Sequence, residues 1–338
     1  MASVPGQFHR ITRGERLGAD LILLAAAAVW GTSFVAGRAV AAQLDPFLYN
    51  GIRFFVAVLT LLPFVGRRLQ GFTRTELWGG ALVGVLLFGA SSVQQVGLGL
   101  TTAGKAGLIT GLYVVLVPLL LALMWRRWPR WSVWIAALLA VAGLFFLSGL
   151  NADIRRASAA GQFRLTPGDA WTVAAAVVWS FHVVSIGQLA PRVNALRLAL
   201  VQYLVGGLLS LVLWLGRGGG QTAFVQDLRV TWWAVLYTGV FSIGLGFTLQ
   251  VVGQQRAPAT DAAVIMSMET VFAALFGWLL LGETLLPQQL FGCVLMLAGM
   301  LLAQVSPGAA GSDRASGSTS EMPASTTAAS PVLPPSSS

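Results

Sequence analysis

Long runs of apolar residues, separated by short polar connections, occupy most of the chain. About 20 apolar residues in helical form cross the roughly 30 Å hydrocarbon core of a bilayer. Runs of this length predict ten membrane-spanning helices. Their expected ranges are 19–41, 47–65, 77–98, 104–125, 131–150, 170–189, 196–215, 231–253, 261–281 and 286–305.

The pattern of the first half returns in the second. The segment Asp20–Trp30 (DLILLAAAAVW) aligns with Asp169–Trp179 (DAWTVAAAVVW) at the aspartate, three alanines, a valine and the tryptophan. Further along, Val96–Leu119 aligns with Val252–Leu275. Because five spans per repeat is an odd number, the second repeat must enter the membrane upside down relative to the first, as in many secondary transporters.

We therefore predict an all-α integral membrane protein of ten transmembrane helices, arranged as two inverted-topology repeats of five helices. The tail is rich in Ser, Ala, Pro, Gly and Thr and is expected to be disordered. The expected segments are an N-terminal cytoplasmic segment 1–18, a first repeat 19–150, a connector 151–168, a second repeat 169–305 and a cytoplasmic tail 306–338.

Composition excludes a water-soluble protein and sets an expected orientation. Hydrophobic residues make up 56% of the chain and charged residues 10%, with a mean hydropathy of +0.76. The net charge of +9 does not indicate nucleic acid, because the arginines stand between spans and concentrate at one set of span ends. The positive-inside rule then places both termini in the cytoplasm, and we expect the cell inner membrane.

Two competing motifs are set aside. The stretch from Arg10 to Ala41 resembles a signal peptide, but its removal would delete the repeat partner of the span around Trp179. Residues 99–106 resemble a P-loop, but Ala106 stands where the magnesium-binding hydroxyl should be. Cys293 is the single cysteine, so no disulfide framework is expected. We expect neither a cofactor nor a metal.

Two tryptophans lie at unusual depth. Most of the others stand at span ends, where amphipathic rings anchor helices at the membrane interface. Trp30 and Trp179 each lie about eleven residues into a span, which at 1.5 Å per residue reaches the bilayer midplane. Inverted repeats place substrate at that depth, so both rings are candidates for a central cavity. Helix packing or contact with lipid is the alternative.

Ionisable residues inside spans are costly in hydrocarbon and form the second set of candidates, namely Arg53, His182 and Glu269. Arg53 can alternatively snorkel to the interface, His182 can be a neutral hydrogen-bonded ring, and Glu269 can be a protonated structural carboxyl. We expect Glu269 to couple transport to a proton, with His182 as second choice. The remaining candidates for the substrate cavity are polar residues at comparable depths or repeat positions, namely Ser33, Gln94, Tyr113 and Gln250.

Four stretches resemble the EamA-type drug/metabolite transporters: Trp30-Gly31-Thr32-Ser33-Phe34, Pro46 through Phe54, Ala103 to Pro118, and Glu269 to Glu283. The resemblance covers about residues 19–305. It implies a ten-span, two-repeat secondary transporter with a central cavity, and it marks Trp30, Ser33, Arg53 and Glu269 as family-pattern positions. One departure is Thr270, which stands where the family often has proline.

The resulting functional hypothesis is an exporter of small metabolites such as amino acids, working by alternating access, with small-molecule substrate and lipid bilayer as its partners and no enzymatic activity. Export follows from the resemblance alone. A nucleotide-sugar or phosphate-ester carrier of the same superfamily should line its cavity with several basic residues, and only Arg53 is available. A polytopic membrane enzyme would need a cluster of His, Asp, Glu or Cys, which the spans lack.

Overall fold

The protein is described from a computed structural model, which covers residues 12–41, 43–66, 70–100, 103–126, 128–148, 166–218, 223–281 and 285–305. Every regular element in these ranges is a helix. Eight helical segments are long and apolar enough to cross a membrane, and the two shorter apolar helices Trp131–Leu147 and Pro287–Ala303 complete the ten. The predicted all-α membrane fold is confirmed. The expected N-terminal segment, connector and tail lie largely or wholly outside the described residues.

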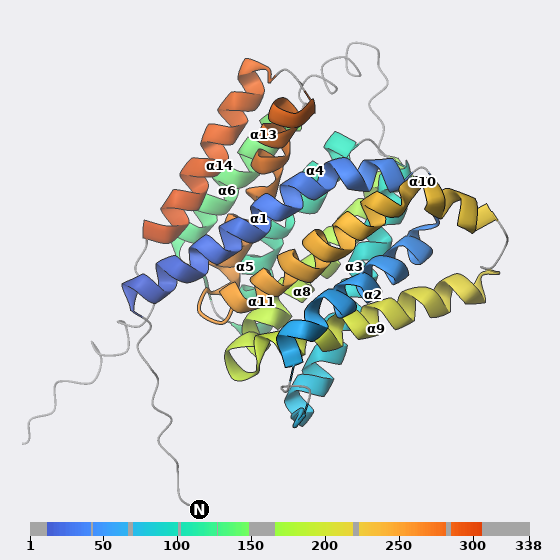
Figure 1. Ribbon diagram of the computed structural model, residues 1–338. Coiled ribbons are helices and arrows are strands. Elements are labelled where there is room, and N and C mark those ends of the chain that lie inside the picture. The colour runs from blue at the N-terminus through green and yellow to red at the C-terminus, as the bar shows by residue number, and fades with distance from the viewer. Residues whose placement is uncertain are drawn as a thin grey trace, which may run out of the picture. The chain divides into compact units, whose positions relative to one another are not determined.

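The helices follow the predicted spans closely (Figure 1). Those of the first half are α1 (Arg13–Ala41), α2 (Pro46–Val65), α3 (Arg74–Leu100), α4 (Ala103–Gly111), α5 (Tyr113–Trp125) and α6 (Trp131–Leu147). Those of the second half are α8 (Pro167–Leu189), η2 (Ala190–Arg192), α9 (Ala195–Gly216), α10 (Ala223–Tyr237), the π-helix η3 (Thr238–Phe247), α11 (Thr248–Gly253), α12 (Ala259–Met266), α13 (Glu269–Leu281) and α14 (Pro287–Val305).

Side-chain caps explain where several spans begin. The carboxylate of Asp45 accepts hydrogen bonds from the backbone N–H groups of the first turn of α2, whose first residue is Pro46. Thr166 and Asp169 form a capping box at the start of α8, and Asn194 caps α9. These caps satisfy the free N–H groups that a helix start would otherwise leave unpaired.

The helices of the two halves interleave, and their packing follows the repeat. Helix α1 packs against the span formed by α10, η3 and α11, and its repeat partner α8 packs against α3. Likewise α1 packs against α12 and α13, whereas α8 packs against α4 and α5. Helices α6 and α14 lie along each other, so closely that a Cβ added to Gly143 would approach the carbonyl oxygen of Gly292 to 2.6 Å. Small residues allow such close crossings between membrane helices.

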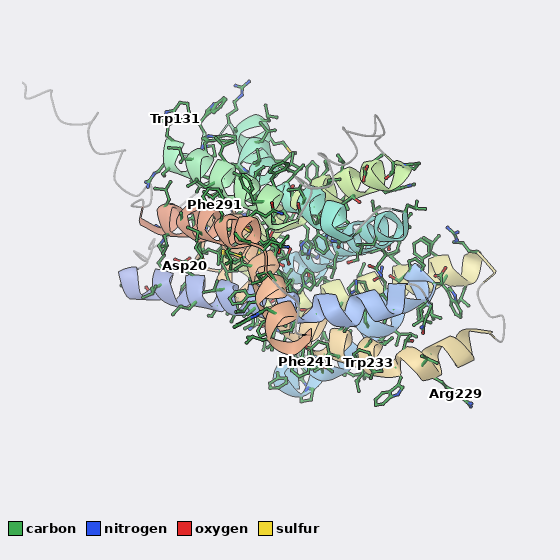
Figure 2. All side chains as sticks on the ribbon, turned by 90° about the horizontal axis from the view of Figure 1, so that it is seen from above. Asp20, Trp131, Arg229, Trp233, Phe241 and Phe291 are labelled. Carbon is green, nitrogen blue, oxygen red and sulfur yellow. The ribbon has the colours of Figure 1, made fainter. Side chains whose placement is uncertain are left out.

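Large apolar side chains cover the outside of the helix bundle. Trp131 and Phe291 are more than half exposed, and Trp233 and Phe241 nearly so. Figure 2 shows Trp131, Trp233 and Phe241 at the edge of the bundle. In a membrane protein such a surface contacts lipid, and the exposed tryptophans at helix ends, such as Trp128, fit the expected interfacial anchors.

Candidate functional site

The two midplane tryptophans contact one phenylalanine. Phe247 is the last residue of η3 and is buried. Its ring lies 4.8 Å from that of Trp30 between centroids, and 5.6 Å from that of Trp179, to which it is stacked at an angle of 13°. Aromatic pairs at such distances stabilise each other beyond the apolar area that they bury. One ring therefore joins corresponding positions of the two repeats.

Both indole N–H groups donate a hydrogen bond to the opposite repeat. Trp30 donates to the carbonyl oxygen of Ser242, 3.0 Å away on η3. Trp179 donates to the side-chain oxygen of Gln94, 3.2 Å away on α3. Because the span containing η3 is the repeat counterpart of α3, each tryptophan is oriented by the equivalent span of the opposite repeat. A buried indole normally needs such a partner.

His182 lies against the same aromatic group. Its ring centroid is 5.5 Å from that of Trp179 and 5.9 Å from that of Phe247, both edge-on. Its Nε2 lies 3.3 Å from the side-chain oxygen of Gln202 on α9. Within the described part of the chain, His182 Nδ1 and Gln202 Nε2 are buried without a hydrogen-bond partner. A buried polar group without a partner is costly, and such groups concentrate where function requires them.

Two spans are broken at equivalent points. The fourth span is divided at Leu112 between α4 and α5, and the ninth at Ser267 and Met268 between α12 and α13. At both breaks the backbone forms tighter bonds between residues three apart, such as Leu112 N to Ile109 O and Met268 N to Ile265 O. Discontinuous helices are the usual place where secondary transporters bind substrate and coupling ions.

Tyr113 and Glu269 are the first residues after the two breaks. They are repeat partners, and they lie close enough to interact electrostatically. Tyr113 is buried and Glu269 is partly buried. The hydroxyl of Thr270 donates to the carbonyl oxygen of Ser267, 3.0 Å away, and the backbone N–H of Thr270 donates to the same oxygen at 3.3 Å. The ninth span therefore breaks without the proline that the family often has.

The π-helix η3 is a third irregularity. It replaces the α-helical backbone over Thr238–Phe247, beside Trp30. Gly246 leaves space for the indole, because a side chain there would collide with Trp30 Nε1. π-helical segments occur mostly at functional sites. All three irregular segments thus adjoin predicted site residues.

Comparison with known proteins identifies the family of this chain. The sequence profile described as the EamA-like transporter family matches residues 17–149 and again residues 166–304. The chain belongs to this family. A protein of Archaeoglobus fulgidus named an uncharacterized transporter is 32% identical over 291 residues, which are 86% of this chain and 87% of the relative.

Two further comparisons extend this EamA assignment. The threonine/homoserine exporter RhtA of Escherichia coli K12 is 27% identical over 295 residues, which cover 83% of this chain and 89% of the relative. A solved crystal structure matches with a TM-score of 0.69 and 22% identity, covering 85% of this chain and 96% of that one, and shows the fold alone. The protein is thus a multi-pass membrane transporter of the EamA family that handles a small molecule, and it is not an enzyme.

Three predicted site residues of this EamA protein bond within their own helix or its cap. Arg53 lies over the Tyr49 ring at 4.5 Å and donates to its hydroxyl at 3.4 Å. Gln250 donates to Gln254 at 3.0 Å. Ser33 donates to a carbonyl of its own helix. The structure therefore assembles Trp30, Trp179 and His182 around Phe247, with Gln94 bonded to Trp179, and it brings Tyr113 within electrostatic range of Glu269.

Sequence reasoning missed several residues. Phe247 carries no pattern that separates it from other core positions. Gln202 had a signal, because it is an amide inside the apolar span 196–215 and occupies the repeat position equivalent to Arg53. Asp20 and Asp261 are buried acidic residues within candidate spans, so Glu269 is accompanied by others. Asp20 had a signal, because it opens the segment that recurs in the second repeat. Among the described residues no group of His, Cys, Asp and Glu could hold a metal ion.

Proposed function

We propose that this protein is a secondary transporter of the cell inner membrane that exports a small zwitterionic metabolite, such as an amino acid, by alternating access. The observation that carries the proposal is that irregular backbone and aromatic contacts occur at equivalent positions of the two repeats. Tyr113 and Glu269 follow equivalent helix breaks, and equivalent tryptophans meet at Phe247. Such a site between inverted repeats can be exposed to either side by rocking of the two halves.

The helix breaks suit a zwitterion. Each break brings together the C-terminal end of one half-helix, which carries partial negative charge, and the N-terminal end of the next, which carries partial positive charge. The ends of α4 and α12 can therefore accept from an ammonium group, and the starts of α5 and α13 can donate to a carboxylate. The relatives named threonine/homoserine exporters support this class of cargo. Trp30 and Trp179 pack against the same buried cluster as Tyr113 and Met268, and their rings suit an apolar portion of the cargo.

Glu269 is the residue proposed to couple transport to a proton. It is acidic, partly buried and placed at the start of α13, so its charge can change as access alternates. His182 is the alternative, since it belongs to the aromatic group rather than to a helix break. Proton coupling would drive export with the membrane proton gradient.

Export is tested by analysis of the culture medium. Cells that overproduce the chain are expected to accumulate one or more amino-acid-like metabolites in the medium, compared with empty-vector cells, as measured by mass spectrometry. Trp232→Ala alters a ring that is 59% exposed at the outside of the bundle and serves as the matched control. Enrichment by the intact chain and by this control is expected. A medium identical to that of empty-vector cells would count against export.

Orientation is tested by reporter fusions. Fusions after residues 70, 128 and 305 are expected to report cytoplasm, and fusions after residues 102, 158 and 222 the outer side, because the arginine-rich span ends should face inward. A cytoplasmic signal at residue 158 would contradict the five-plus-five inversion. The same fusions test the proposal that both termini are cytoplasmic.

A further inference from the structure

Three charged contacts between described residues join the halves at one end of the bundle. Helices α1, α3, α9 and α12 all begin on the same side, because successive spans alternate in direction. There Arg16 on α1 pairs with Asp261 on α12, and Arg197 on α9 lies 3.3 Å from Glu76 on α3. The third contact, at 3.8 Å, joins Arg256 just before α12 to Glu15 on α1, and both side chains are more than a third exposed. Each ion pair connects one half of the chain to the other. The two junctions differ in how completely their polar atoms are satisfied.

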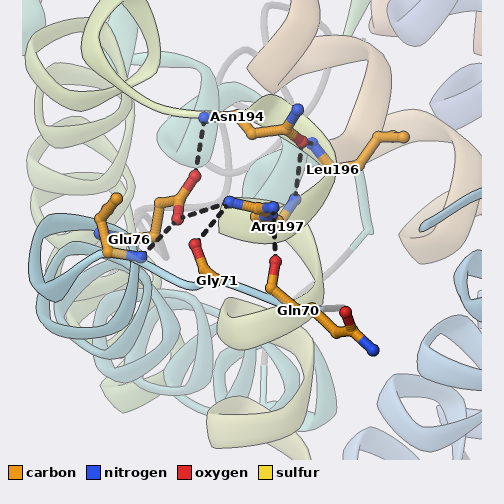
Figure 3. A network of polar contacts seen from close by, with 7 residues as sticks. Gln70, Gly71, Glu76, Asn194, Leu196 and Arg197 are labelled. Atoms are coloured by element: carbon orange, nitrogen blue, oxygen red, sulfur yellow. Dashed lines mark hydrogen bonds and ion pairs between the residues drawn. The ribbon is translucent and has the colours of Figure 1, made fainter. Parts of the chain in front are cut away.

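The α3–α9 junction is saturated with hydrogen bonds (Figure 3). Both carboxylate oxygens of Glu76 have partners, and Arg197 donates to backbone carbonyls as well as to Glu76. A buried charge with its hydrogen bonds formed is held firmly, since opening the junction would break the bonds made by Asn194 and Arg197 together. The partners are the backbone N–H groups of Thr73 and Asn194 and the carbonyl oxygens of Gln70 and Gly71, at 2.8 to 3.2 Å.

The α1–α12 junction is incompletely satisfied. Asp20, labelled near the start of α1 in Figure 2, is 5% exposed, and its Oδ1 has no hydrogen-bond partner among the described residues. Arg16 Nε is likewise buried without a partner there. Two carboxylates, Asp20 and Asp261, therefore share Arg16, with Arg130 at the start of α6 within electrostatic range of Asp261. Unsatisfied buried polar atoms favour any arrangement that pairs or hydrates them.

A second acidic residue lies on the same helix as Arg16. Asp20 lies four residues after Arg16 on α1, the spacing at which helical side chains face each other. Moving the guanidinium from Asp261 to Asp20 would keep Arg16 paired, and the longer, more exposed pair of Arg256 with Glu15 would be the ion pair that remains at this junction. Asp261 would then be hydrated at the opened end. This exchange has no counterpart in the described contacts of Glu76 and Arg197.

We propose that the α1–α12 junction is the gate of the transporter and opens by exchange of Arg16 from Asp261 to Asp20, while the α3–α9 junction stays closed. The inference rests on the alternating-access cycle proposed above. It specifies which residues of this cycle move and which stay in place. Its test needs neither cargo nor a proton gradient, so failed export and a failed gate are distinguishable.

Thiol labelling of the full chain tests the gate in lipid nanodiscs, where both faces are accessible. In a Cys293→Ala background, Ala19→Cys places a thiol on α1 and Ala199→Cys places one on α9, at sites 3% and 0% exposed. A water-soluble maleimide is expected to react at least about tenfold faster at the first position, within the range of allosteric couplings. Equal rates, or faster reaction at the second position, overturn the proposal.

Matched carboxylate-to-amide variants locate the cause. Asp261→Asn is expected to speed labelling of Ala19→Cys by about tenfold, because Arg16 then prefers Asp20. Glu76→Gln is expected to leave labelling of Ala199→Cys within about threefold and instead to lower the unfolding temperature. Acceleration at both positions, or at neither, contradicts the assignment of roles.

If Asp261→Asn does not fold, a variant with the opposite expected effect on the labelling rate tests the gate. Asp20→Asn removes the exchange partner of Arg16 and relieves an unpartnered buried carboxylate. It is expected to slow labelling of Ala19→Cys below the rate of the parent protein. An unchanged or faster rate shows that Arg16 does not open the junction by exchange with Asp20.

Discussion

Glu269→Gln is expected to abolish the pH dependence of transport while leaving cargo binding in place. Glutamine matches the shape and hydrogen-bonding capacity of a protonated glutamate but cannot release a proton. Couplings between two ligands of one protein typically amount to about 1–3 kcal/mol, or roughly 5- to 150-fold in affinity. A pH effect of that size in the parent protein should therefore disappear in the variant.

The measurement is flux into or out of proteoliposomes from about pH 5.5 to about pH 8.5, a range that includes the pKa values of histidine and of perturbed carboxyl groups. Trp232→Ala is the control, because its ring is 59% exposed at the outside of the bundle, away from the charged junctions. It should keep the parent profile. A parent-like profile in Glu269→Gln would exclude Glu269 as the coupling group, and the same series with His182→Gln then tests the alternative.

The spans were predictable from sequence because hydropathy and helix length act locally. Twenty apolar residues cross a bilayer whatever their neighbours do, so the ranges 47–65 and 196–215 agree with α2 and α9 to within a residue. The repeat predicted two halves of five helices, whereas their interleaved packing is visible only in the structure. The breaks were harder to predict. Gly111 precedes the first break, but the second follows Met266 and carries neither glycine nor proline there.

The site was only partly predictable, because depth within a span is readable from sequence and direction around the helix is not. Trp30 and Trp179 share a depth, and the structure brings both onto Phe247. Arg53 and Gln250 also had suitable depth, but they bond to Tyr49 and Gln254, which lie four residues away on the same helix or its cap. Phe247 itself was one of 18 phenylalanines, and only the three-dimensional packing distinguishes it.

Trp30→Ala and Trp179→Ala are each expected to weaken transport by roughly thirtyfold in apparent affinity, since aromatic residues at binding hot spots cost about 2 kcal/mol or more on truncation. Each variant removes a ring that packs against Phe247 and an indole N–H that donates to an oxygen of the opposite repeat. Because the two positions are equivalent, the losses should be similar. Concentration-dependent flux in proteoliposomes measures both.

The control for these variants must separate binding from packing. Trp232→Ala removes a ring of equal size from the lipid-facing surface and should leave flux unchanged. Trp30→Phe and Trp179→Phe keep a ring against Phe247 but lose the indole N–H, so they distinguish stacking from orientation by Ser242 and Gln94. If both alanine variants fold, as judged by size-exclusion chromatography, and transport with the parent affinity, the two rings serve helix packing alone. A loss confined to one of them would place the cargo in one repeat rather than between the two.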